Sequence, residues 1–145
     1  DASQSVIAAW GNHGLFLKAQ SAIELLNYDY AISLLHGILK EEAGFLQGRE
    51  ILRMAQGARL RATGKKSKGL LSGGMLKVKG KVKKDPLAAL LEIEKKLDND
   101  PGNIEANTLL YDAFMALGVA ELAVFGLETV RNFHPNEMKN LRTFF

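Results

Sequence analysis

A chain of 145 residues, 47% of them apolar, is long enough to bury a hydrophobic core and too apolar to stay disordered. It contains no cysteine, which excludes disulfides, thiolate metal sites and thiol catalysis. Ten basic residues and no acidic residue lie between Arg59 and Lys84, whereas the rest of the chain carries nine basic and sixteen acidic residues, a net charge of −7.

The first third of the chain predicts a helical hairpin followed by a further helix. Apolar residues recur at helical spacing in Leu15–Leu26 and again in Tyr30–Leu39, with Asn27 at the turn between them. Ala31 is a small residue near the start of the second of these helices. Phe45–Arg61 then predicts the first helix of the next hairpin.

A basic insertion at residues 63–84 interrupts this pattern. Its five glycines predict a flexible segment, and the alternation of residues over Met75–Val82 predicts at most one short strand. One interpretation is an arm that binds phosphate groups of nucleic acid or of an anionic membrane. The other is a solvated loop whose leucines pack on the body of the protein. The segment has no aromatic side chain on which bases could stack, which argues against single-stranded nucleic acid. The lysines of the insertion are Lys65, Lys66, Lys68, Lys77, Lys79, Lys81, Lys83 and Lys84.

The second half of the chain contains clear signals for helix ends. Asp85 followed by Pro86 predicts the start of a helix that runs to Leu97. A helix over Asn103–Leu117 and another over Ala120–Asn132 follow, separated by Gly118. The last segment, residues 136–145, predicts the start of a further helix.

Two pairs of like residues are separated by the same number of positions in the sequence, and we call this separation the period. The period separates Pro101 from Pro135, and it also separates Ala89 from Ala123. Its length, about 34 residues, is typical of stacked helical hairpins. The interval from Ala31 to Ala89 is longer than one period, and the excess corresponds to the length of the basic insertion.

The segment from Ile104 to Pro135 resembles a tetratricopeptide repeat, with Leu110, Phe114, Gly118 and Ala123 at the positions that the family fills with such residues. It departs from the family at Tyr111, where a small residue is usual. The resemblance implies a single all-α domain over 1–145, built from antiparallel helix-turn-helix hairpins stacked as a right-handed superhelix. The repeats lie near 12–43, 46–101 and 104–135, the second one interrupted by the insertion.

The resemblance implies a non-catalytic scaffold that binds a peptide or a partner protein on its concave helical surface. The lysine and asparagine clamp that some family members use for a peptide carboxylate is not evident, and Asn107 is the one candidate for a remnant of it. The alternative is that the same positions face plain solvent or are covered by neighbouring repeats. The positions that the resemblance places on the concave surface are His13, Phe16, Gln20, Ile23, Glu24, Glu105, Thr108, Asp112, Met115 and Ala116.

No pattern for catalysis, for a metal or for a cofactor emerges from the sequence. The glycines and lysines of the insertion do not match a nucleotide-binding P-loop. The acidic run over Asp98–Asn103 resembles a calcium loop, but Leu109 stands where a bidentate glutamate is required. His13, His36 and His134 have no metal-site spacing. We therefore predict that the protein is not an enzyme.

Both ends of the chain are apolar, which indicates self-association as a further alternative. The tail carries Met138, Leu141, Phe144 and Phe145, and the residues before His13 have the character of the end of an earlier helix. Terminal repeats normally present a polar outer face, so these ends predict a homo-oligomer or a longer array. We expect the protein to be cytoplasmic, with a secreted protein that has lost its signal as the alternative.

Overall fold

The computed structural model describes residues 2–64 and 71–135, and the side chains of residues 11–64 and 75–135. The described residues form helices and turns and no strand, so the protein is all-α, as predicted. The helices group into two compact units, residues 1–64 and residues 65–145, which we call the first and the second unit. The first unit holds α1 (Ala2–Glu24), α2 (Tyr28–Glu41) and α3 (Leu46–Thr63), and the second holds α4 (Leu71–Lys84), α5 (Pro86–Leu97), α6 (Ile104–Ala116) and α7 (Ala120–Phe133).

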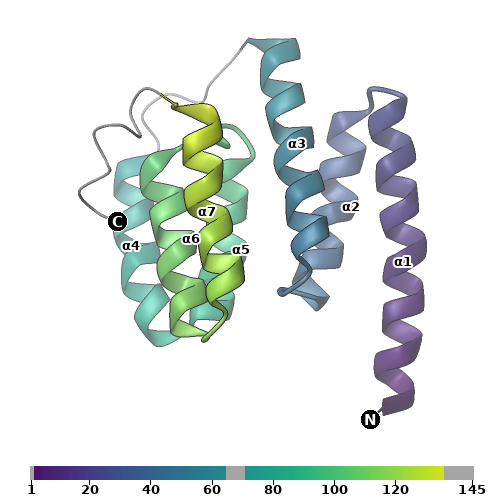
Figure 1. The fold of residues 1–145 in the computed structure, drawn as a ribbon, viewed down its shortest axis with the longest axis horizontal. Coiled ribbons are helices and arrows are strands. Elements are labelled where there is room, and N and C mark those ends of the chain that lie inside the picture. Colours follow the sequence, from purple (N-terminus) through teal and green to yellow (C-terminus); the bar gives the residue numbers. More distant parts are fainter. Residues whose placement is uncertain (1, 65–70, 136–145) are drawn as a thin grey trace. The chain divides into compact units, whose positions relative to one another are not determined.

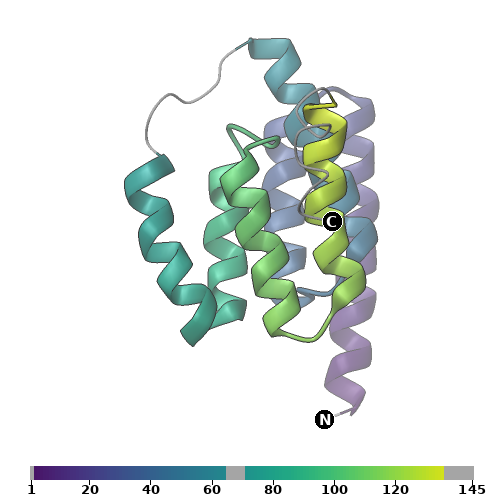
Figure 2. The ribbon, with the colours of Figure 1, turned by 60° about the vertical axis from the view of Figure 1, so that its left-hand side comes forward.

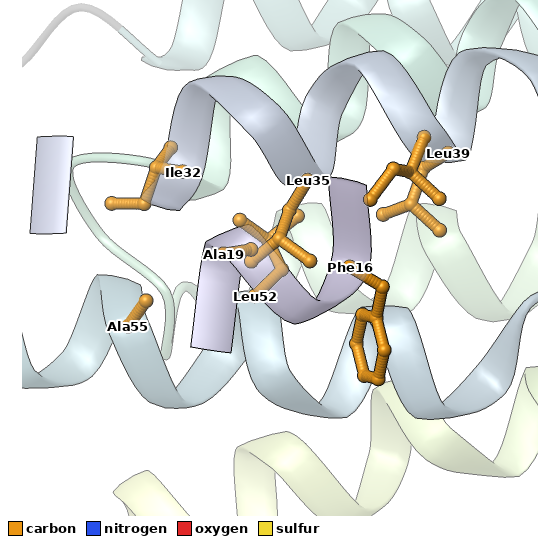
Figure 3. Packing of buried hydrophobic residues seen from close by; sticks show 8 residues of the cluster. Phe16, Ala19, Ile32, Leu35, Leu39, Leu52 and Ala55 are labelled. Atoms are coloured by element: carbon orange, nitrogen blue, oxygen red, sulfur yellow. The ribbon is translucent and has the colours of Figure 1, made fainter. Parts of the chain in front are cut away.

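The first unit is a three-helix arrangement with one core. Helices α1 and α2 form the predicted hairpin, and α3 packs mainly against α2 (Figure 1). Leu35 of α2 is fully buried in this core. Because apolar side chains from three helices meet there, burial of this face holds the unit together. Figure 3 shows the cluster, which consists of Phe16 and Ala19 from α1, Ile32, Leu35, Ile38 and Leu39 from α2, and Leu52 and Ala55 from α3.

Helix α1 is longer than the sequence predicts. The segment before His13 has the character of an earlier helix, but it continues α1 without a break from Ala2 to Glu24. Gly11 and Gly14 are helix-stop signals by sequence, but no proline separates the two stretches and the helix continues through both glycines. The expected boundary near residue 12 is therefore wrong.

The turn between α2 and α3 is closed by a buried arginine. The side chain of Arg49 is 1% exposed, and its Nε and Nη2 atoms both donate to the Ala43 carbonyl oxygen, at 3.1 and 3.0 Å. Gly48 lies beside it, where a Cβ atom would come within 2.7 Å of the Phe45 ring. The turn therefore packs closely around a guanidinium group that reaches back along the chain to Ala43.

The second unit consists of two helical hairpins. Helix α4 pairs with α5, α6 pairs with α7, and α6 also packs against both α4 and α5 (Figure 2). The predicted helix starts are confirmed, because the Asp85 side chain accepts from the Ala88 N–H at 3.2 Å and the Asn103 side chain accepts from the Ala106 N–H at 2.8 Å. These caps locate α5 and α6 within the bundle.

Helices α6 and α7 approach each other at a glycine. A Cβ atom on Gly126 would lie 2.8 Å from the backbone oxygen of Asn107. Ala123, which the sequence predicts at a close crossing, is fully buried on the same helix. Gly126 lies about one turn further along α7, and the α6 backbone approaches it too closely for a Cβ atom. Small residues are needed here because a larger side chain would separate the helices.

The basic insertion is not a loop with a short strand. Residues 71–84 form helix α4, and Met75, Val78 and Val82 are buried on one side of it. Their spacing of three and four residues places them on one helix face. A helix satisfies its own backbone hydrogen bonds, whereas a lone strand would need a partner strand. The prediction of a strand over Met75–Val82 is therefore wrong.

The boundaries of the expected middle repeat also change. Residues 46–101 were expected to combine the helix from Phe45 with the helix from Asp85, but α3 belongs to the first unit and α5 pairs with α4. Helix α4 ends at Lys84 and α5 begins at Pro86, so a turn at Asp85 closes their hairpin. The chain divides near Gly64 into these two compact units. The predicted helix at 136–145 lies outside the described residues.

Candidate partner-binding surfaces

The expected binding positions on α1 do not form an open surface. Phe16 is 6% exposed and belongs to the core of the first unit. Its ring meets the Phe45 ring edge to face, with centroids 5.0 Å apart and an interplanar angle of 66°. The assignment of Phe16 to a binding surface is therefore wrong, because its position on α1 turns toward α2 and α3.

The other four positions on α1 differ in their exposure. His13 and Glu24 are exposed, whereas Gln20 is half-buried. Ile23 is also half-buried and packs against the core cluster. The α1 set thus offers scattered polar side chains and no continuous stripe.

The expected positions on α6 do form a continuous stripe. Glu105, Thr108, Asp112 and Met115 are all exposed, and Ala116 beside them is exposed as well. Their spacing of three, four and three residues places them on one face of the helix. The Thr108 hydroxyl donates to the Ile104 oxygen of the preceding turn at 2.8 Å. The stripe is acidic at two positions and apolar at Met115, which is 48% exposed.

Helix α4 presents a second exposed surface, which is basic. Lys77, Lys79, Lys83 and Lys84 are exposed, and Lys81 is half-buried and pairs with Glu92 of α5. Leu76, at 72% exposure, adds an apolar side chain. These closely spaced lysines repel one another along the helix, so this surface favours a negatively charged neighbour. Lys65, Lys66 and Lys68 lie outside the described residues.

The exposed residues of α4 and α6 share one face of the second unit. The Lys81–Glu92 pair marks the side of α4 that adjoins α5. Lys79 and Lys83 lie two positions away from Lys81 in either direction, about 160° around the helix, and therefore point away from α5. The stripe on α6 lies opposite the buried side of that helix. We call the surface formed by Leu76, Lys79, Lys83, Glu105, Thr108, Asp112 and Met115 the α4–α6 face.

Asn107 is not part of this face. It is fully buried, and its Nδ2 atom donates to the Pro101 oxygen at 3.0 Å and to the Asn103 oxygen at 2.8 Å. These bonds tie α6 to the turn that precedes it. The expectation that Asn107 is a remnant of a carboxylate clamp is therefore wrong.

The three histidines lie on different helices, and the acidic turn lies before α6. His13 lies on α1, His36 on α2 and His134 at the end of α7, where its Nε2 atom is 2.7 Å from the Gly102 oxygen. Asp100 accepts from the Asn103 side chain at 3.3 Å in the turn before α6. Across residues 2–64 and 71–135, no three His, Cys, Asp or Glu side chains are grouped as a metal site would require.

Sequence reasoning missed one exposed feature in the first unit. Leu25 and Leu26, directly after α1, are 81% and 71% exposed, and Tyr30 nearby is 48% exposed. The helical periodicity predicts that both leucines belong to the helix. In the structure both follow its end, and the backbone of Leu26 is left-handed. Helical periodicity alone carries no signal for this turn.

Three comparisons with known proteins give no match: no family model, no curated protein and no solved structure is similar to this chain. Within the part of the chain that the structure describes, no helix combines the length and the apolar character needed to cross a bilayer.

Proposed function

We propose that this chain is a non-catalytic protein-binding module of the tetratricopeptide type, and that a partner docks on the α4–α6 face. The observation that carries the proposal is the exposed stripe of Glu105, Thr108, Asp112 and Met115 on α6. In helical repeat proteins, such a face is formed by the first helices of successive hairpins. Helices α4 and α6 are the first helices of two hairpins and pack against each other.

The chemistry of the face supports this proposal. It combines charged side chains of both signs with the exposed side chains of Leu76 and Met115. Mixed apolar and charged surfaces of this kind are typical of protein interfaces, where apolar contacts give affinity and charges give specificity. The α4–α6 face therefore fits a protein segment better than it fits a small molecule.

A pull-down experiment tests this proposal. The intact chain is immobilised and incubated with a lysate of the source cells, and bound proteins are identified by mass spectrometry. The variant Thr108→Arg/Met115→Arg places two bulky cations on the face, and Glu121→Arg/Val124→Arg, at exposed positions of α7, is the matched control. We expect the face variant to lose a partner that the control retains. Equal capture by both variants would contradict the proposal.

The lysines of α4 favour a second candidate function, which is binding to an anionic membrane. Lys77 and Lys84 are exposed on α4 and do not belong to the α4–α6 face. The apolar side of α4 (Met75, Val78 and Val82) is buried, so such binding would be electrostatic and would weaken steeply with salt. Sedimentation with vesicles that contain acidic phospholipid, at low and high salt, tests this candidate. Binding that is insensitive to salt or to Lys77→Gln/Lys84→Gln would exclude it.

A further inference from the structure

The α4–α6 face carries opposite charges on its two halves. Lys79 and Lys83 of α4 are positive, and Glu105 and Asp112 of α6 are negative. None of these four side chains forms an ion pair within the described residues. The face therefore presents a positive strip beside a negative strip.

The pattern restricts what can occupy the whole face. An acidic segment would be attracted by α4 and repelled by α6, and a basic segment would meet the reverse. The best occupant carries negative charge over α4 and positive charge over α6. A second copy of the face, rotated by 180° about an axis parallel to the helices, presents this pattern. Its α6 then lies over α4 of the first copy, and its α4 lies over α6.

We propose that the occupant of the α4–α6 face is a second copy of this chain, in a twofold dimer that pairs α4 of each copy with α6 of the other. Such an interface is isologous, because the same patch serves on both copies. The inference rests on the proposed function, since it names the partner of that same face. Leu76 and Met115 add one exposed apolar side chain from each helix to the contact.

The heights of the charges along the helices support this pairing. Helices α5 and α7 start one period apart, at Pro86 and Ala120. Asp112 of α6 lies one period after Val78 of α4, so these two residues have the same height along their helices. Lys79 is the neighbour of Val78 in the sequence. A rotation axis parallel to the helices keeps these heights, so Lys79 of one copy lies level with Asp112 of the other. Lys79 and Asp112 therefore meet in register across the interface. Lys83 corresponds to Leu117 and Glu105 to Leu71, so these two charges do not pair with each other.

Two charge-reversed chains test the dimer. Lys79→Glu/Lys83→Glu makes both strips negative, and Glu105→Lys/Asp112→Lys makes both strips positive. We expect the unmodified chain to associate in sedimentation velocity experiments, more strongly at low salt. Each variant alone should dimerise more weakly, by about tenfold, whereas an equimolar mixture of the two should form a heterodimer.

The matched control carries the same change of net charge elsewhere. Lys40→Glu/Lys95→Glu reverses exposed lysines on α2 and α5 and should leave association unchanged. Circular dichroism of every variant establishes that the helices are retained. An unmodified chain that stays monomeric at every concentration would overturn the dimer, and so would a mixture of the two variants that forms no heterodimer.

The same chains separate this inference from the proposed function. If the chain stays monomeric but Lys79→Glu/Lys83→Glu loses a captured partner, the face binds a different protein and only the dimer is wrong. If the chain stays monomeric and no face variant alters capture, the face is not a binding surface and both proposals fail.

Discussion

Leu26 and Gly118 occupy the same position in two equivalent helix-ending turns. At the end of α1, the Leu26 N–H donates to the Ile23 oxygen and the Asn27 N–H donates to the Ala22 oxygen, at 2.9 and 2.8 Å. After α6, Gly118 and Val119 repeat the pattern with the oxygens of Met115 and Phe114, at 3.0 and 2.9 Å. Both residues have a positive φ, 63° for Leu26 and 77° for Gly118. This is the turn in which glycine is preferred, because a Cβ atom is strained there.

Replacing Leu26 by glycine should stabilise the first unit. The left-handed backbone is strained for leucine, and the side chain is 71% exposed, so little packing is lost. We expect the free energy of unfolding to rise by about 0.5–1 kcal/mol, measured by urea denaturation. Gly118→Ala is the converse substitution at the equivalent turn and should lower stability by about 1 kcal/mol. A Leu26→Gly variant less stable than the unmodified chain would show that the leucine side chain makes a stabilising contact.

Replacing Gly126 by alanine should destabilise the second unit. The new Cβ atom would lie 2.8 Å from the Asn107 backbone oxygen, and backbone atoms cannot move aside as a flexible side chain can. We expect a loss of about 1–3 kcal/mol, with faster amide hydrogen exchange in α6 and α7. The matched control is Gly80→Ala in α4, where a Cβ atom meets nothing within 4 Å. That variant should gain about 0.5–1 kcal/mol, since alanine favours a helix interior over glycine.

Replacing Arg49 by methionine should destabilise the turn between α2 and α3. The change removes both hydrogen bonds to the Ala43 oxygen and leaves that carbonyl without the guanidinium group. We expect a loss of about 2–4 kcal/mol, measured by thermal and urea denaturation. Arg49→Lys should rescue little of this, because an ammonium group cannot make the paired contact. Arg61→Met, at an exposed position of α3, should stay within about 0.5 kcal/mol of the unmodified chain.

Replacing Asn107 by alanine should destabilise the start of α6. The substitution removes the donor that joins the Pro101 and Asn103 oxygens, in a fully buried position. We expect a loss of about 1–3 kcal/mol, and faster hydrogen exchange in the turn before α6. The neighbouring Thr108→Ala changes an exposed residue whose hydroxyl bonds only within its own helix. Equal losses for the two variants would contradict the structural role assigned to Asn107.

Local signals in the sequence predicted the helix ends well. The caps at Asp85 and Asn103 and the turn at Gly118 all lie where the sequence indicates. Each signal acts through hydrogen bonds or backbone angles among close neighbours in the chain, so distant parts of the chain do not change it. The positions on α6 came from the family resemblance, and the structure shows them exposed on one side of that helix.

Pairing between helices was harder to predict. Over Met75–Val82, alternation suggested a strand, and the three- and four-residue spacing of Met75, Val78 and Val82 became decisive only once α5 and α6 were there to bury them. The starts of α5 and α7 lie one period apart, but the expected middle repeat paired α5 with the helix from Phe45, whereas α5 pairs with α4. Phe16 likewise fits a surface position until the residues around Phe45 close over it.

The sequence by itself determined the helical class, most helix ends and the separation of the basic segment from the acidic remainder of the chain, because those properties depend on neighbouring residues and on composition. Only the tertiary structure decided that the basic segment is the helix α4, that the chain divides at Gly64, and that Phe16 and Asn107 are buried. These outcomes depend on which apolar faces cover one another. Residues distant in the chain make that choice, and no local pattern encodes it.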